Sequence, residues 1–224
     1  MSTDEQPQLY LITPPRIDPG FPDLLARILD TRAVACLRLD LAGAREEDIA
    51  RHADPLRARS SSERMPSADP LREVAHAREV ALVISDHVLL AQRLGLDGVH
   101  LGDGARSVRA ARHMLGADAI VGSYCGTSRH DGMNAGEAGA DYIGFGPVGE
   151  TGLGDGSRAE GELFAWWSDL IEIPVVAEGG LTPDLVAKLA PVTDFFGIGA
   201  EIWDHEAPLA ALDTLLAPLG AAGS

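Results

Sequence analysis

The sequence predicts a single-domain α/β fold, a (β/α)8 TIM barrel, from three observations. Apolar runs of four to six residues alternate with amphipathic stretches of ten or more along the chain. The runs are apolar throughout, as expected of parallel strands that are buried on both faces. The length of 224 residues is typical of one barrel domain. A doubly wound open sheet is the alternative.

Eight apolar runs are expected to be strands, and a helical pattern follows most of them. Each run is too short for a helix, and each helical segment spaces its apolar residues along one face. In chain order, the expected strands cover residues 9–13, 34–38, 81–85, 98–101, 119–122, 142–144, 175–177 and 194–198. The expected helices cover residues 22–30, 46–57, 87–94, 108–115, 133–138, 163–170, 183–189 and 209–216. Eight such repeats favour closure into a barrel.

The barrel is expected to span residues 8–217, with flexible tails at 1–7 and 218–224. Between the second and third strands, the pentapeptide Ala-Asp-Pro-Leu-Arg at residues 53–57 recurs at 68–72. We interpret this repeat as a local tandem insertion. Residues 58–68 then form an inserted mobile loop, because this Ser- and Arg-rich piece has too little apolar content to pack.

Composition limits the partners and the compartment. The net charge of −16, from 18 basic and 34 acidic residues, argues against nucleic acid or an anionic membrane as a partner. No apolar run approaches the roughly 20 residues that span a bilayer, and the N-terminus has no signal-peptide pattern. Cys36 and Cys125 make no disulfide framework and are expected to be small buried side chains. We expect a cytoplasmic protein, and a homo-oligomer is left open.

The seventh expected strand ends in the pattern of a phosphate seat. Glu178 and a pair of glycines follow the strand, and Thr182 and Pro183 then provide a helix N-cap and first turn. Glycines let the backbone approach an anion closely, and free amides at a helix start point toward it. Barrels commonly bind phosphate after strands seven and eight. The predicted seat comprises Gly179, Gly180, Gly199 and Ala200.

Polar residues at other strand ends suggest further site groups. Arg38 could bind a phosphate bidentately, or form a structural ion pair with Asp40 or Asp86. Asp86 and Asp103 could supply oxygen ligands to a magnesium ion that also holds a diphosphate. Glu178 is a candidate for substrate binding or proton transfer. His100, within an apolar strand, is expected to be a hydrogen-bonded core residue rather than a catalyst.

Together these strand ends resemble the thiamine phosphate synthase family over roughly residues 9–203. The stretches that carry the resemblance are 9–13 (Leu-Tyr-Leu-Ile-Thr), 84–86 (Ile-Ser-Asp), 96–102 (Leu-Asp-Gly-Val-His-Leu-Gly), 140–148 (Ala-Asp-Tyr-Ile-Gly-Phe-Gly-Pro-Val), Thr151 and 174–180 (Pro-Val-Val-Ala-Glu-Gly-Gly). The resemblance implies a TIM barrel that joins hydroxymethylpyrimidine diphosphate to thiazole phosphate and releases pyrophosphate with Mg²⁺ present. It also implies substrate-binding roles for Ser123, Tyr124 and Thr151.

The chain departs from the family pattern where the diphosphate would bind. The usual Gln-x-Arg-x-Lys of the second strand is Cys36, Arg38 and Asp40, and the usual His-x-Gly-Gln-x-Asp ends in Ala105, so Asp103 would have to substitute as metal ligand. The usual Gly-x-Ser-x-His has Ser123 one place early, Tyr124 in the serine position and no histidine. The usual Thr-x-Thr-Lys keeps only Thr151.

Both family lysines are therefore missing, and Lys188 is the only lysine of the chain. Each lost charge-assisted hydrogen bond is worth roughly 1.5–3 kcal/mol, so losing both could weaken diphosphate binding by about 10²- to 10⁴-fold. Three hypotheses follow: a divergent synthase with Arg38 and Glu178 as catalytic residues, a thiazole tautomerase-like isomerase with Glu178 as base, and a non-catalytic binder of thiazole phosphate or thiamine phosphate.

Overall fold

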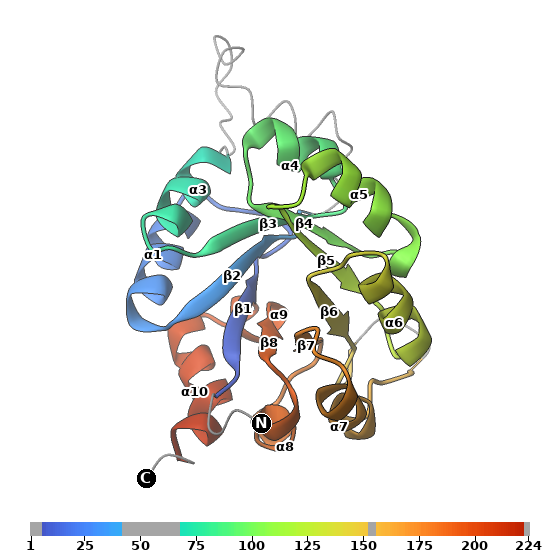
Figure 1. Cartoon of the computed structure of the whole chain (residues 1–224). Helices are drawn as coiled ribbons and strands as arrows, with labels where there is room; N and C mark the ends of the chain where they lie inside the picture. The colour runs from blue at the N-terminus through green and yellow to red at the C-terminus, as the bar shows by residue number, and fades with distance from the viewer. Residues whose placement is uncertain (1–5, 42–67, 152–155, 222–224) are drawn as a thin grey trace.

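Eight parallel strands close into a barrel in the computed structural model, which describes residues 6–41, 68–151 and 156–221 (Figure 1). Neighbours in sequence are neighbours in the sheet, and β8 pairs with β1. The strands are β1 (Gln8–Ile12), β2 (Val34–Leu39), β3 (Ala81–Ser85), β4 (Gly98–Leu101), β5 (Ile120–Tyr124), β6 (Tyr142–Phe145), β7 (Val175–Glu178) and β8 (Phe195–Ile198). The closed β8–β1 pairing confirms the predicted barrel and excludes the open sheet.

The helices form an outer ring around the strands (Figure 1). They are α1 (Phe21–Thr31), α3 (Ala68–His76), α4 (Val88–Leu94), α5 (Val108–Leu115), α6 (Arg129–Glu137), α7 (Gly161–Leu170), α8 (Pro183–Leu189), α9 (Ala200–Trp203) and α10 (Pro208–Ala221), with 3₁₀ turns η1 (Gly104–Arg106) and η2 (Ala190–Val192). Among those described, α1 shows why such segments are helical: Phe21, Leu25 and Ile28 recur on one buried face.

The strands divide the apolar residues into two clusters, because successive side chains of a strand point to opposite faces. In β7, Val175 belongs to the large cluster between strands and helices, whereas Val176 belongs to a small cluster inside the barrel. The same alternation in β2 places Leu37 outside and Cys36 inside. The next inward position is Arg38 in β2 and Glu178 in β7, so the alternation directs both charged side chains into the barrel near its carboxyl end.

Most expected elements are confirmed, with shifts at their ends. The expected helix 46–57 lies outside the described residues, as does 58–67 of the expected loop. Ala68, which we expected to close that loop, begins α3 instead, so the second copy of the repeated pentapeptide is the start of a helix. The helix expected at 133–138 begins earlier, at Arg129, because the Ser128 hydroxyl accepts a hydrogen bond from the Asp131 amide and caps it.

The expected flexible tail at 218–224 is wrong for residues 218–221, which complete α10. Leu219 packs against the large cluster. Its carbonyl accepts a hydrogen bond of 3.0 Å from Gln6 Nε2, within the expected N-terminal tail. Burial and this contact hold both segments on the barrel. In the described part of the chain, no helix has both the length and the apolar character needed to cross a membrane.

Candidate functional site

A cavity of about 300 Å³ lies at the carboxyl ends of the strands, mainly over β1, β2, β7 and β8. This is the end of a barrel at which active sites occur. Among the predicted site residues, it brings together Arg38, Thr151, Glu178, Gly179, Gly180, Gly199 and Ala200, and it adds Asp40, Glu201, Trp203 and Asp204.

The inner wall of this cavity holds a buried ion pair between β2 and β7. Arg38 Nη1 donates a hydrogen bond of 2.9 Å to Glu178 Oε2, and both side chains are nearly buried. Gly197 of β8 leaves room for the pair, since a Cβ there would lie 2.7 Å from Glu178 Cβ. The partner of Arg38 is therefore Glu178, and neither of the aspartates considered from the sequence.

The two aspartates have other partners. Asp40 Oδ1 accepts from Ser85 Oγ at 2.7 Å, and Asp86 Oδ1 accepts from the Gly102 amide at 2.7 Å. Both aspartates are exposed at the rim, so water and these partners satisfy them. Arg38 lies deeper, where Glu178 is the carboxylate within reach.

Arg38 keeps its charge, and its Nε donor is unpaired. Burial acts to lower the pKa of its guanidinium, but the Glu178 carboxylate raises that pKa above its usual value. Arg38 Nε is buried without a hydrogen-bond partner among the described residues. A buried unpaired donor costs roughly 1–3 kcal/mol, so this atom favours an acceptor group from a ligand in the cavity.

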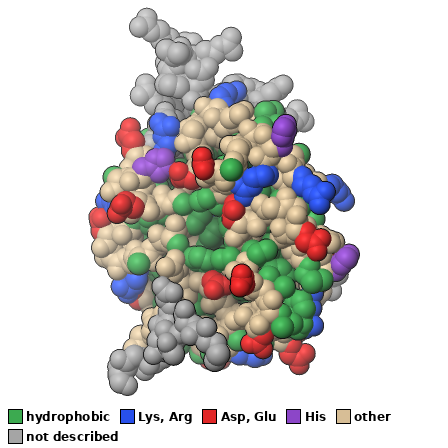
Figure 2. Space-filling view, viewed as in Figure 1, with side chains coloured by type: hydrophobic (Ala, Val, Ile, Leu, Met, Phe, Trp, Pro, Cys, Tyr) green, Lys and Arg blue, Asp and Glu red, His purple; other side chains and the backbone are tan. Residues whose placement is uncertain are grey.

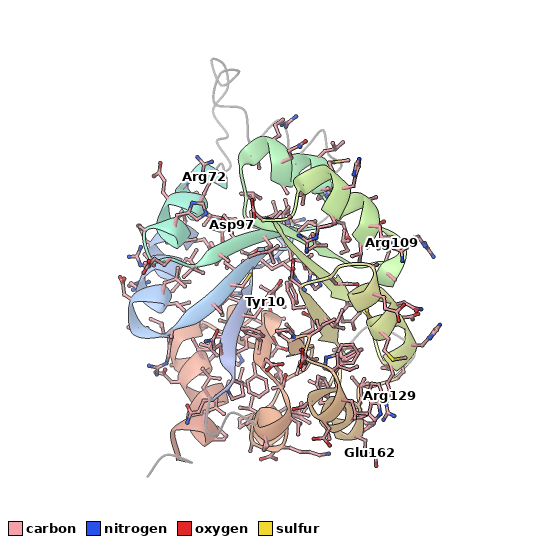
Figure 3. The ribbon with its side chains drawn as sticks, in the orientation of Figure 1. Tyr10, Arg72, Asp97, Arg109, Arg129 and Glu162 are labelled. Carbon is pink, nitrogen blue, oxygen red and sulfur yellow. The ribbon has the colours of Figure 1, made fainter. Side chains whose placement is uncertain are left out.

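A polar cluster continues below Arg38 inside the barrel. The guanidinium lies over the Tyr10 ring, 5.8 Å from its centroid, and Figure 3 shows Tyr10 within the ring of strands. Tyr10 Oη and Tyr142 Oη are 2.6 Å apart, and Tyr142 Oη is 2.9 Å from His100 Nδ1. Burial, and then Arg38, lower the pKa of His100 well below its usual value. His100 is thus the hydrogen-bonded core histidine that the sequence predicted.

The predicted phosphate seat has the expected backbone. Gly179 and Gly180 have φ of +85° and +74°, which glycine adopts without strain, and the Thr182 hydroxyl caps α8 by accepting from the Leu185 amide. We call the backbone N–H groups of Gly180, Leu181 and Gly199 the amide cup.

A carboxylate of the chain itself occupies the amide cup. Glu201 Oε1 accepts hydrogen bonds from the amides of Gly180 (2.8 Å) and Leu181 (3.1 Å), and Oε2 accepts from Gly199 (2.8 Å). The sequence predicted an anion at these amides, but not that residue 201 would supply one. No local sequence pattern distinguishes Glu201 from the acids at the starts of other helices.

The predicted metal ligands lie on neighbouring loops, after β3 and β4. Asp86 has a left-handed φ of +59°, and a Cβ on Gly102 would lie 3.3 Å from its Oδ2. Asp103, next in sequence to Gly102, accepts from Ser107 Oγ at 2.6 Å. Within the described residues, no group of three or more His, Cys, Asp and Glu could hold a metal ion. Mg²⁺ commonly takes only one or two carboxylates from a protein and completes its shell with water and phosphate oxygens.

The remaining predicted substrate-binding residues differ in position. Ser123 is fully buried, and its hydroxyl donates to the Gly104 carbonyl at 3.0 Å, so it does not line the cavity. Tyr124 is half-buried, and burial, followed by the Glu178 charge, raises its pKa to about 12. Thr151 is exposed and lines the cavity.

The cavity is short of positive charge. Among its lining residues in the described part of the chain, Arg38 is the only Lys or Arg, beside four acids: Asp40, Glu178, Glu201 and Asp204. The single lysine, Lys188, lies on α8 next to Gly161 at the start of α7. Arg109 and Arg129 lie on the outer helices (Figure 3), and Figure 2 shows acidic and basic side chains scattered around an apolar centre.

Comparisons with known proteins agree with this fold. A family model described as thiamine monophosphate synthase matches residues 9–198. The thiamine-phosphate synthase of Rhodospirillum centenum is 41% identical over 207 residues, which cover 91% of this chain and 93% of the relative. That of Erythrobacter litoralis is 38% identical over 210 residues, with 91% and 92% covered. The structure of a thiamine phosphate pyrophosphorylase from Pyrococcus furiosus shares the fold, with a TM-score of 0.74, 22% identity and 97% of both chains covered.

Proposed function

We propose that this chain, which belongs to the thiamine monophosphate synthase family, is a transferase that joins hydroxymethylpyrimidine diphosphate to thiazole phosphate and releases pyrophosphate. The observation that carries the proposal is the match to thiamine-phosphate synthases across nearly the whole barrel. The cavity at the carboxyl ends of the strands supports it, because barrel active sites lie at this end and the glycines of the amide cup line the cavity.

In this proposal, the amide cup takes the phosphate of the thiazole substrate, with Gly179 and Ala200 beside it. Thr151 and Tyr124 contact the substrates, and Tyr124 acts as a neutral hydrogen-bonding group because its pKa is about 12. Ser123, which is buried on the Gly104 carbonyl, supports the wall of the site from behind.

Arg38 stabilises the leaving group. The C–O bond between the pyrimidine methylene and the diphosphate breaks with its electron pair on the diphosphate, and the thiazole nitrogen forms the new C–N bond. Charge accumulates on the departing oxygen, and a fixed buried guanidinium stabilises that charge more than water does. Glu178 holds the guanidinium in place through Nη1, and Nε has no partner among the described residues.

Asp86 and Asp103 would hold Mg²⁺ together with diphosphate oxygens. When bound, Mg²⁺ supplies Lewis-acid stabilisation of the leaving pyrophosphate. The Gly102 amide holds Asp86 and the Ser107 hydroxyl holds Asp103, so both carboxylates are oriented before any cation arrives.

The test supplies both substrates with Mg²⁺ and measures pyrophosphate release and thiamine phosphate formation together. We expect both products in equal amounts, and neither when thiazole phosphate is omitted. Absence of thiamine phosphate at high enzyme concentration would reject the synthase assignment.

The charged residues that line the cavity favour one second candidate function, in which the protein binds thiazole phosphate without turnover. Arg38 is the only cation that lines the described cavity, and it is already paired with Glu178. A diphosphate with several negative charges would meet four acids there. Calorimetric titration with thiazole phosphate alone distinguishes the two, since a binder gives heat with this ligand and no consumption of the diphosphate in the assay above.

A further inference from the structure

The amide cup is an anion site of the cavity that the Glu201 carboxylate already occupies. One carboxylate accepts three backbone hydrogen bonds of 2.8, 3.1 and 2.8 Å, and it uses both of its oxygens to do so. Three charge-assisted bonds of this length are strong. The side chain that makes them comes from α9, just after the last strand of the barrel.

We propose that Glu201 is an internal competitor for the substrate phosphate and thereby sets the affinity of the site for it. The substrate phosphate binds the amide cup only after the Glu201 carboxylate has left. The identity of the ligand, thiazole phosphate, rests on the proposed function. The competition itself concerns any phosphate that reaches the cup.

Glu201 and a phosphate cannot accept the hydrogen bonds of the amide cup at the same time. Each backbone amide has a single hydrogen to donate, and the three amides of the cup all donate to Glu201. A phosphate oxygen can accept these hydrogens only if the carboxylate gives them up. Two anions sharing the cup would also repel each other strongly in a partly buried place.

The net negative charge of the cavity also weakens phosphate binding while Glu201 is present. With Arg38 against Asp40, Glu178, Glu201 and Asp204, the lining carries an excess of three negative charges when all five groups are ionised. Removing Glu201 reduces that excess by one charge at the point where the phosphate binds. Phosphate should therefore gain from both the freed amides and the weaker repulsion.

The structure also provides a place for the displaced side chain. Glu201 lines a second hollow as well, together with Thr182 and His205. Because the same side chain borders both hollows, its carboxylate can leave the amide cup for the second one. In the second hollow, the Thr182 hydroxyl and the His205 ring offer hydrogen-bonding groups.

The size of the effect follows from population arithmetic. When only a fraction of molecules has an open cup, the apparent dissociation constant rises by the inverse of that fraction. Hydrogen bonds to charged groups are worth enough that one or two of them correspond to about 10- to 100-fold in affinity. We expect removal of the Glu201 carboxylate to tighten phosphate binding by at least about tenfold.

The experiment titrates inorganic phosphate, and separately thiazole phosphate, into wild-type protein and the variants Glu201→Ala and Glu201→Gln. The dissociation constant should fall by about tenfold or more in Glu201→Ala. It should fall less in Glu201→Gln, whose amide keeps one accepting oxygen. Glu172→Ala, which removes the same charge from an exposed position before β7 that lines neither hollow, serves as the control and should leave the constant unchanged.

Equal or weaker phosphate binding by a folded Glu201→Ala would overturn the proposal, as would equal gains in Glu172→Ala. If the alanine variant does not fold, the near-isosteric glutamine variant decides by the same criterion. The inorganic phosphate titration needs no turnover, so a wild-type protein that makes no thiamine phosphate would refute the proposed function and leave this test intact. In an active enzyme, KM for thiazole phosphate should fall in Glu201→Ala while KM for the pyrimidine diphosphate stays constant.

Discussion

The amide cup after β7 and β8 and the charged rim after β2, β3 and β4 bind anions in different ways. The cup uses backbone N–H groups, which the path of the chain positions and which most side-chain substitutions leave in place. The rim uses the exposed Asp86 and Asp103 together with the buried Arg38, and a single substitution removes any one of these side chains. A single side-chain substitution can therefore remove a binding group of the rim, whereas the cup changes only when the backbone moves.

The two regions also share a feature. In each, the group expected to bind the ligand already holds a carboxylate of the chain: Glu201 in the cup and Glu178 on Arg38. The first carboxylate is only half-buried, whereas the second is buried within the barrel. We therefore regard Glu201 as displaceable and Glu178 as a fixed part of the site, and four predictions test this comparison.

The largest effect is expected from Arg38→Met, which removes the only cation of the described cavity. It leaves Glu178 buried without its partner, and breaking a buried pair in this way destabilises a protein by about 3–5 kcal/mol. Turnover should fall by about 10²- to 10³-fold, as when a fixed donor to a charged transition state is lost. Denaturant unfolding and steady-state kinetics measure the two effects.

A matched control for Arg38 is Arg32→Met. Arg32 pairs with Asp213 on the surface, and exposed pairs are worth only about 0–1 kcal/mol. Equal unfolding free energies for the two variants would show that the Arg38–Glu178 pair is not a fixed structural element. Arg38→Met combined with Glu178→Leu should recover part of the lost stability.

Gly149→Ala should damage the cup while sparing the rim. A Cβ at Gly149 would lie 1.8 Å from the carbonyl oxygen of Gly180, so backbone must move. We expect a loss of about 1–3 kcal/mol in the free energy of unfolding and loss of phosphate binding in calorimetry. Gly20→Ala is the control, because nothing lies within 4 Å of its Cβ. Retention of full phosphate affinity by Gly149→Ala would place the phosphate elsewhere.

Asp86→Asn should damage the rim while sparing the cup. Asparagine tolerates the φ of +59° and keeps the acceptor for the Gly102 amide, so folding is preserved. Changes around metal ligands alone cost about 10- to 100-fold in metal affinity. The Mg²⁺ concentration for half-maximal turnover should therefore rise by about tenfold or more, with phosphate binding unchanged. Asp118→Asn, at the amino end of β5, should have no effect; an unchanged Mg²⁺ requirement in Asp86→Asn would remove Asp86 as a ligand.

The smallest effect concerns pH and the three tyrosines. Burial, as the largest cause, raises the pKa of Tyr10 and Tyr142 well above the usual value, and that of Tyr124 to about 12. The unfolded chain loses these protons near pH ~10, so stability is fully present below that pH and falls as pH rises toward the folded values. Ultraviolet difference absorbance should show no tyrosinate in native protein at pH ~10. A tyrosinate signal from a single tyrosine at that pH would be assigned to Tyr124, because its side chain is half-buried whereas Tyr10 and Tyr142 are buried.

Local patterns predicted the strands well, within one or two residues at each end. A strand buried on both faces must be apolar over its whole length, and a polar or glycine residue marks where it leaves the barrel. Helix ends were less predictable. The start of α6 depends on the Ser128 cap, and the end of α10 depends on Leu219 meeting the core and Gln6.

The sequence by itself determined the barrel and the resemblance to the family, because each rests on short patterns of residues close together in the chain. Only the tertiary structure decided which side chains meet in the site. Arg38 and Glu178 are 140 positions apart and face each other because the barrel closes. Glu201 reaches the amides of Gly180 and Leu181 because β7 and β8 are neighbours in that closed sheet. Such contacts depend on chain closure, and no spacing within a single segment encodes them.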